Sequence, residues 1–368
     1  MLGDFKESME AFMEDTDIEV KVEVNAPAET ATEVEETTTE ATEVEDTAEE
    51  VEENDEEAQM YITFYRRLYT FKDYLSKYGC NRSFLSMVNS DGEFSSMLGM
   101  DMPSCESLSH TGSPSSDISQ SCLSALNQRL ATQDKFLRSF HRRATERLIA
   151  FQEAVDKRCR TMLRNIARIS KRMYEIKQDY RTDDKKADTK IFSLESLDRI
   201  CVTYPAKLLD VVDKEISLLS KIAITENASP EVRQAASVHK VMSDCLSMAS
   251  KYNENKRQAK KERISLKDLS VRDTATMLNR ATNLIKRVQK NVKALSMISK
   301  MTKTYQNGSH MKMNESILNS MSPVKPLALA SETSYLTIFP VKLMKNDLKL
   351  ANLYLRTAGQ RISAIKNS

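Results

Sequence analysis

The sequence contains no tryptophan, and only seven glycines and eight prolines in 368 residues. Barrels, sandwiches and glycine-rich nucleotide folds need many tight turns, and therefore more glycine and proline than this chain has. Helix-forming residues are plentiful instead, and there are 19 methionines. The composition predicts a mostly α-helical protein, long enough for one to three domains.

Motifs for catalysis and metal binding are also missing. The six cysteines are scattered, with none within four residues of another, so the sequence shows neither a metal knuckle nor a redox pair. The four histidines stand in no motif, and there is no phosphate loop, His-Glu-x-x-His or Gly-x-Ser-x-Gly pattern. We therefore predict a protein that is not an enzyme and that uses no metal or cofactor.

Long hydrophobic runs are absent as well. No run approaches the roughly 20 residues that cross a bilayer, and residues 1–7 lack the apolar core of a signal peptide. We predict a protein that is made in a reducing cytoplasm and has no membrane partner.

The net charge of +1 hides a strong segregation. Residues 1–60 hold 23 acidic residues and two lysines, a net charge of −21, whereas residues 61–368 hold 52 basic and 30 acidic residues, a net charge of +22. Residues 21–58 are rich in Glu and Thr, with few large apolar groups to offset charge repulsion and ordering entropy. We therefore predict that residues 1–58 form a disordered acidic leader.

The most regular pattern lies between residues 140 and 180. Its apolar positions recur every three or four residues, with the mean spacing of about 3.6 that is typical of an α-helix: Phe140, Ala144, Leu148, Phe151, Val155, Cys159, Met162, Ile166, Ile169, Met173, Ile176 and Tyr180. From Arg138 to Arg172 there are eleven Lys or Arg against three acidic residues. We therefore expect the apolar face of this helix to pack against an apolar partner. The basic faces of the helix either bind a polyanion or an acidic partner, or form an ordinary solvated surface.

A second long helix of the same kind is predicted over residues 271–305. Its apolar face runs from Met277 to Thr302, and its other faces are basic. We predict further helices over residues 61–78 (ended by Gly79), 229–252 and 343–365, and one or two helices over residues 193–219, with breaks at prolines such as Pro340. Residues 256–263 are predicted to be an exposed basic connection.

Together these patterns predict a mostly α protein, an elongated helical bundle preceded by the disordered acidic segment. The predicted domains are the leader (1–58), a small aromatic helical region with a turn (59–108), a linker (109–118) and a basic helical domain (119–368). The aromatic stripe from Tyr61 to Tyr78 is interpreted as core rather than as a base-stacking surface.

Three short blocks resemble one protein family. Residues 78–85 (YGCNRSFL), 91–98 (DGEFSSML) and 105–108 (CESL) are similar to a block in the internal head proteins of giant tailed bacteriophages related to phiKZ. The resemblance implies a non-enzymatic virion protein, made in the host cytoplasm and packed with DNA inside the capsid. It also implies an acidic propeptide that a prohead protease removes by cutting after Glu in small-x-Glu sequences.

Several such triplets occur in the chain. Glu106 is the first candidate for the cleavage site, because Ser104-Cys105-Glu106 lies in a polar connection ahead of the basic helix, and Glu50 is the second.

The resulting prediction is a phage internal head protein that binds packaged DNA without sequence preference and contacts capsid or other internal head proteins. The candidate DNA-contacting residues lie on the two basic helices: Arg142, Arg143, Arg147, Lys157, Arg158, Arg160, Arg164, Arg168, Lys171, Arg172, Lys286, Arg287, Lys290 and Lys293. The alternative is a helical scaffold or interaction protein that binds partner helices and has no nucleic-acid role. A coiled-coil regulator in a cell is the third interpretation.

Overall fold

The structure is a computed structural model that describes residues 28–89, 116–176, 180–200, 208–224, 229–306 and 324–367. The chain divides into two compact units, residues 1–39 and residues 40–368. Of the first unit, the structure describes the beginning of helix α2, and all the packing described below lies within the second.

Helices dominate the described residues, which confirms the predicted mostly α fold. The helices are α2 (Ala28–Tyr78), α3 (Arg82–Asn89), α5 (Ser116–Ala131), α6 (Gln133–Tyr174), α7 (Leu194–Asp198), α8 (Leu208–Ile224), α9 (Ser229–Ser250), α10 (Tyr252–Lys261), the 3-10 helix η2 (Leu266–Asp268), α11 (Val271–Gln306) and α13 (Val324–Ser363).

Two short antiparallel strand pairs join distant parts of the chain. Strand β1 (Tyr180–Thr182) pairs with β4 (Ile365–Asn367), and β2 (Lys190–Ile191) pairs with β3 (Ile264–Ser265). The first pair attaches the chain after α13 to the connection that follows α6. None of these strands was predicted.

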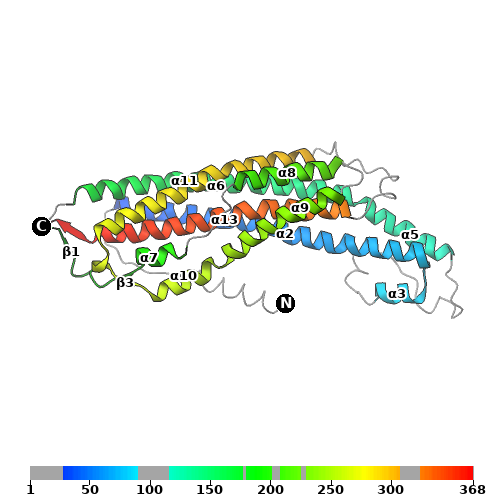
Figure 1. Cartoon of the computed structure of the whole chain (residues 1–368), viewed down its shortest axis with the longest axis horizontal. Helices are drawn as coiled ribbons and strands as arrows, with labels where there is room; N and C mark the ends of the chain where they lie inside the picture. The colour runs from blue at the N-terminus through cyan, green and yellow to red at the C-terminus, as the bar shows by residue number, and fades with distance from the viewer. Residues whose placement is uncertain are drawn as a thin grey trace. The chain divides into compact units, whose positions relative to one another are not determined.

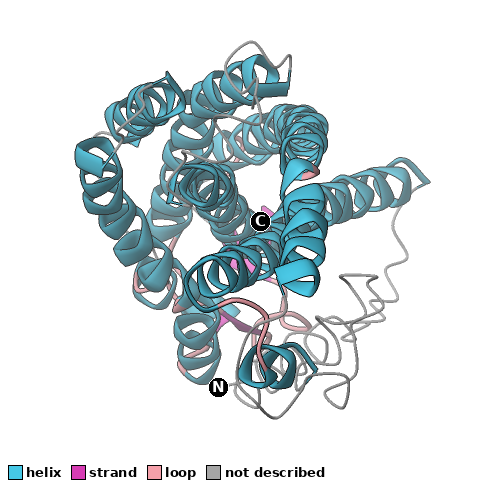
Figure 2. Ribbon diagram, turned by 90° about the vertical axis from the view of Figure 1, so that its right-hand side faces the viewer, coloured by secondary structure: helices cyan, strands magenta, loops and turns pink. Residues whose placement is uncertain are grey.

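Helix α13 forms the centre of the second unit. It packs on α6, α8, α9 and α11 (Figure 1). The end-on view shows the helices side by side (Figure 2).

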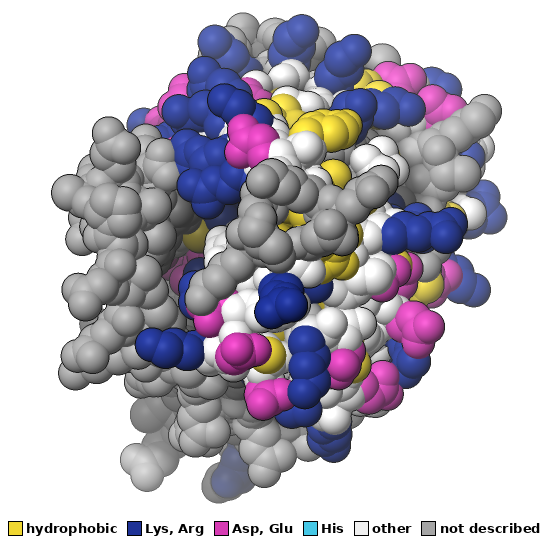
Figure 3. Space-filling view, turned by 90° about the vertical axis from the view of Figure 1, so that its left-hand side faces the viewer, with side chains coloured by type: hydrophobic (Ala, Val, Ile, Leu, Met, Phe, Trp, Pro, Cys, Tyr) yellow, Lys and Arg dark blue, Asp and Glu magenta, His cyan; other side chains and the backbone are white. Residues whose placement is uncertain are grey.

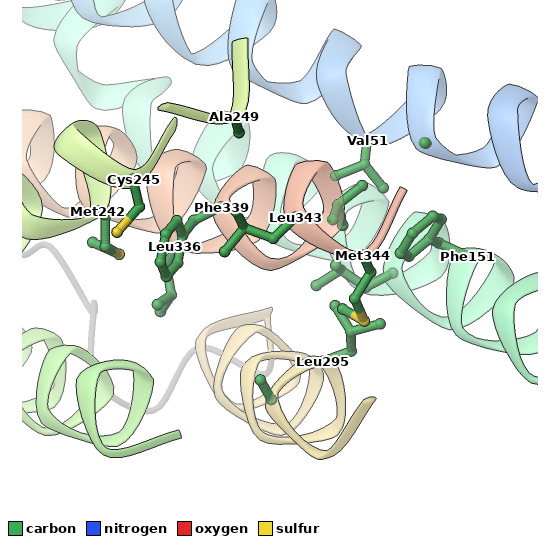
Figure 4. Close-up of a cluster of buried hydrophobic side chains, with 14 of the residues drawn as sticks. Val51, Phe151, Met242, Cys245, Ala249, Leu295, Leu336, Phe339, Leu343 and Met344 are labelled. Carbon is green, nitrogen blue, oxygen red and sulfur yellow. The ribbon is translucent and has the colours of Figure 1, made fainter. Parts of the chain in front are cut away.

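The side chains that α13 contributes to the core come from several of its faces. Leu336, Phe339, Leu343 and Met344 are fully buried. Figure 4 shows them among side chains from α9, such as Met242 and Cys245, and from α11, such as Leu295. Burial on several faces is typical of a central helix rather than a surface helix.

This burial explains a wrong prediction about Pro340. The proline was expected to break the chain, with a last helix over residues 343–365, but α13 begins at Val324 and continues through Pro340. An internal proline costs a helix about 3 kcal/mol. The buried side chains on both sides, including Phe339 and Val341, offset that cost.

The other helix predictions are confirmed in large part. Helix α11 matches the predicted 271–305, and α9 begins at the predicted Ser229. The basic helix predicted over residues 140–180 corresponds to α6, which begins earlier, at Gln133, and ends earlier, at Tyr174. Helix α5 precedes it, and the chain turns at Thr132 between the two. Residues 256–263 are not a simple connection, since most of them belong to α10.

The aromatic stripe packs in the core, as predicted. Tyr61, Tyr65 and Leu68 are buried in α2, and the Tyr61 ring stacks on Phe136 of α6 with centroids 4.4 Å apart. The helix ends at Tyr78, and Gly79 follows with a φ of 67°, a left-handed conformation that glycine adopts without strain.

The acidic segment is the main correction to the predicted fold. Residues 40–58, predicted to be disordered, are helical and form one continuous α2 with the aromatic stripe, across the predicted boundary at residue 58. Val44, Ala48 and Val51 recur at helical spacing and are buried. Residues 21–27 of the predicted disordered stretch lie outside the described residues.

Candidate nucleic-acid interface

Seven of the ten candidate residues on α6 are exposed to solvent: Lys157, which pairs with α2, and six others. These six are Arg142, Arg160, Arg164, Arg168, Lys171 and Arg172. The apolar stripe of α6 faces the core, so basic residues between its members are directed outward. Five of the six lie in the last four turns of the helix, where the described residues include no acidic side chain before Glu175.

Helix α11 contributes a second exposed row. Lys286, Lys290 and Lys293 follow one another at i, i+4 and i+7, which places them on one face, and all three are exposed. Arg287 is different. Its guanidinium donates two hydrogen bonds to the carboxylate of Asp347 on α13, a residue that is almost fully buried. Arg287 therefore has a structural partner, which makes it a poor candidate for DNA contact.

The other four candidates on α6 face the acidic half of α2. The Arg143 guanidinium lies 2.8 Å from a Glu57 carboxylate oxygen, and the Lys157 ammonium 2.7 Å from that of Glu43. Arg147 donates to both Glu53 and Asn54, at 2.9 and 2.8 Å. These contacts run antiparallel along the two helices.

The deepest contact in this set joins Arg158 to Glu40. Both side chains are almost fully buried, and the closest charged atoms are 3.8 Å apart. Glu40 also accepts a hydrogen bond of 2.9 Å from the Thr161 hydroxyl. Burial lowers the pKa of Arg158 from its usual value, and the nearby Glu40 carboxylate counteracts that effect. The pair anchors the N-terminal end of the packed part of α2.

Helix α13 pairs with α2 from the other side. Glu52 lies 3.7 Å from Lys342 and 3.5 Å from Lys345, and Glu45 lies 3.4 Å from Lys349. The acidic half of α2 therefore runs between cations of α6 and cations of α13, which cancel the like-charge repulsion that predicted disorder.

The two candidate cleavage sites differ in their surroundings. Glu50 is exposed, but it lies within α2 between the buried residues Ala48 and Val51. A protease needs an extended substrate, so cleavage there requires local unfolding of α2. Glu106 lies outside the described residues.

Lys and Arg also gather on one end of the second unit. Figure 3 views the end where β1 and α10 lie, and dark blue side chains cluster over its upper left part. Acidic and basic side chains are mixed over the lower part of the same face.

A cluster of titratable side chains between α8, α9 and α13 was not predicted from the sequence. Glu215 is fully buried, and neither carboxylate oxygen has a hydrogen-bond partner among the described residues. Burial, and then the nearby Glu332, raise its pKa from 4.5 to about 8. Glu332 itself bonds to Nδ1 of His239 at 2.8 Å. The signal was available, since Glu215 follows Leu208 and Val212 on the inward face of α8.

The fold also joins two cysteines that the sequence separates. Cys80 and Cys122 are both buried, and each thiol influences the pKa of the other. Burial raises the pKa of both, that of Cys80 to about 12. Neither thiol is therefore activated as a nucleophile.

A shallow pocket of about 350 Å³ lies between α7, α11 and α13. Its charged lining is neutralised from within the protein. Arg280 lies 3.5 Å from Asp198, which also accepts a hydrogen bond from Tyr354, and Arg287 is held by Asp347. The pocket therefore resembles a packing gap between paired charges rather than a built ligand site.

Fold and interface together define a helical bundle with a basic surface that an acidic helix of the same chain partly covers. No known protein family, no curated protein and no solved structure matches the chain. Among the described helices, none combines the length and apolar character needed to cross a membrane. The described residues also contain no group of three or more His, Cys, Asp or Glu side chains placed to hold a metal ion.

Proposed function

We propose that this chain is a non-enzymatic structural protein of a phage virion interior, which binds packaged DNA without sequence preference through exposed residues of α6 and α11. The observation that carries the proposal is the concentration of exposed Lys and Arg on α6 and α11, with no acidic residue on α6 between Asp156 and Glu175. Lys and Arg on helix backs neutralise phosphates rather than read bases.

In this proposal, a prohead protease removes the acidic leader inside the assembling capsid, where the protein contacts other internal head or capsid proteins. Cleavage after Glu106 removes α2 entirely and uncovers all four cations of α6. Cleavage after Glu50 removes Glu40 and Glu43 but leaves Glu53 and Glu57 in place. The N-terminus in mature particles, measured by mass spectrometry, distinguishes these products. Residues 1–50 found intact there would refute the propeptide role.

DNA binding is tested with the full-length chain and a 20-base-pair duplex over a salt series. If about six phosphates are engaged, log K falls with log salt with a slope near −5. The triple variant R160E/R164E/K171E reverses exposed charges of α6, and we expect it to reduce affinity at low salt at least tenfold. The matched control R233E/K240E/K251E makes the same charge change on and next to α9, and we expect a much smaller effect. Equal losses in both variants would show that net charge alone sets the affinity.

A second candidate function is a helical scaffold without a nucleic-acid role. It is favoured by the buried apolar stripe of Val44, Ala48 and Val51, because that stripe makes the acidic half of α2 part of the core. In this function, the cations of α6 exist to hold helices. Absence of duplex binding by the wild-type chain at low salt would favour the scaffold.

A further inference from the structure

The acidic half of α2 occupies a groove between α6 and α13 with two charged rims. Arg143, Arg147 and Lys157 form the α6 rim. Lys342, Lys345 and Lys349 form the α13 rim. The carboxylates of α2 divide between these rims: Glu43, Glu53 and Glu57 pair with α6, and Glu45 and Glu52 pair with α13.

The floor of the groove is apolar. Val44, Ala48 and Val51 belong to the same buried cluster as Phe151 of α6 and Met344 of α13. Figure 4 shows Val51 pointing from α2 toward the region where Phe151 and Met344 lie. These three residues of α2, which we call the apolar seam, have small side chains. The helix can therefore pack closely between the two rims while its long Glu side chains extend to both of them.

We propose that this groove is a recognition site for an acidic amphipathic helix of a partner protein, and that residues 40–58 are its resident occupant. The fitting partner carries a narrow seam of Ala and Val with Glu on both flanks. Duplex DNA matches the rims but not the floor, because it has no apolar surface to cover Phe151 and Met344. This inference does not depend on the proposed DNA binding, which uses exposed residues outside the groove.

The resident helix is held in a way that permits exchange. Most of its ion pairs are partly exposed, and such pairs contribute about 0–1 kcal/mol each and weaken with salt. The apolar seam consists of small side chains, so the area that it buries is modest. The tether to the rest of α2 gives the resident helix an effective concentration in the millimolar range, which a free competitor must exceed.

The test uses the full-length chain and a fluorescent peptide of residues 39–60 as the probe. In the variant E43Q/E53Q/E57Q the resident helix loses its three pairs with the α6 rim and keeps only the buried Glu40–Arg158 ion pair with that helix. The wild-type peptide therefore competes more easily for the groove. We expect the variant to bind the peptide at least tenfold more tightly than the wild-type chain does, with affinity that falls as salt rises. Circular dichroism verifies folding, and the milder E43Q/E53Q is used if the triple variant unfolds.

Two further variants locate the binding site. Adding R143E/R147E/K157E to the neutralised background reverses the α6 rim, and we expect peptide binding to be lost. Adding R233E/K240E/K251E instead makes the same charge change away from the groove, and we expect binding to be retained. Loss in both, or in neither, would overturn the proposal, as would failure of the neutralised variant to bind the peptide.

A duplex competitor separates this inference from the proposed function. If the groove is selective for helices, an excess of 20-base-pair DNA leaves most of the peptide bound to the neutralised variant. Full displacement that depends on Arg143, Arg147 and Lys157 would assign the groove to nucleic acid and overturn the helix proposal. The DNA proposal fails under a different result: the chain shows no duplex binding that requires Arg160, Arg164 and Lys171.

Discussion

Replacement of Glu215 by glutamine is expected to stabilise the protein at neutral pH. Burial, and then the Glu332 carboxylate, raise the pKa of Glu215 from 4.5 to about 8. A carboxyl group with a higher pKa in the folded protein than in the unfolded chain opposes folding once the unfolded chain ionises. The free energy of unfolding should therefore fall as pH rises from about 4.5 to about 8.

The magnitude follows from the size of the shift. Each pKa unit corresponds to about 1.4 kcal/mol, so a shift from 4.5 to about 8 gives an upper limit of about 5 kcal/mol at pH 8 and above. Glutamine has nearly the same shape and cannot ionise, so Glu215→Gln removes this penalty. The buried amide still lacks hydrogen-bond partners, and we therefore expect a net gain of roughly 1–3 kcal/mol at pH 8.

The assay is urea unfolding of the wild-type chain and the variant at pH 5 and at pH 8. The variant should be more stable than the wild type at pH 8, and the difference should shrink toward pH 5. Glu254→Gln makes the same substitution on the exposed surface of α10 and is the control. If Glu215→Gln changes the free energy of unfolding by the same amount at both pH values, the Glu215 carboxyl is not held protonated by burial.

Three other predictions concern α2 and the buried cysteines. Arg158→Met should destabilise the protein by about 3–5 kcal/mol in urea unfolding, because it leaves Glu40 buried without its cation, and adding Glu40→Gln should restore part of the loss. Raising the salt to 1 M should speed hydrogen exchange in residues 40–58 more than in α13, since screening weakens partly exposed ion pairs; equal acceleration would contradict a charge-held helix. A mild disulfide-forming oxidant should join Cys80 to Cys122 only slowly in the folded protein, because the raised pKa values of both thiols suppress the thiolate. Mass spectrometry measures the rate, and rapid disulfide formation would contradict this prediction.

The sequence predicted the long helices well, because their patterns are local. Helices α6 and α11 repeat large apolar residues every three or four positions over many turns, and that signal needs no knowledge of the partner. Pro340 shows the limit of local rules. Its cost to a helix is known from the sequence, but the burial of Phe339 and Val341 that offsets the cost depends on α6, α9 and α11.

The acidic half of α2 was missed for a similar reason. Its stripe contains only small residues, so it was hard to distinguish from a low-complexity segment. The cations that stabilise it are far away in sequence, as Glu57 and Arg143 show. The candidate interface was therefore only half predictable: the sequence identified the basic residues of α6, but it did not reveal which of them an acidic helix of the same chain occupies.

The central position of α13 has a consequence for synthesis of the protein. Helix α13 follows in chain order every described helix that it packs against, including α6, α9 and α11. A nascent chain that has reached residue 306 therefore holds long apolar stripes whose common partner has not yet been made. The core must close after α13 leaves the ribosome, and until then the stripes are open to aggregation or to chaperones. Chains stalled before residue 324 should accordingly be bound by chaperones far more than chains extended beyond residue 367.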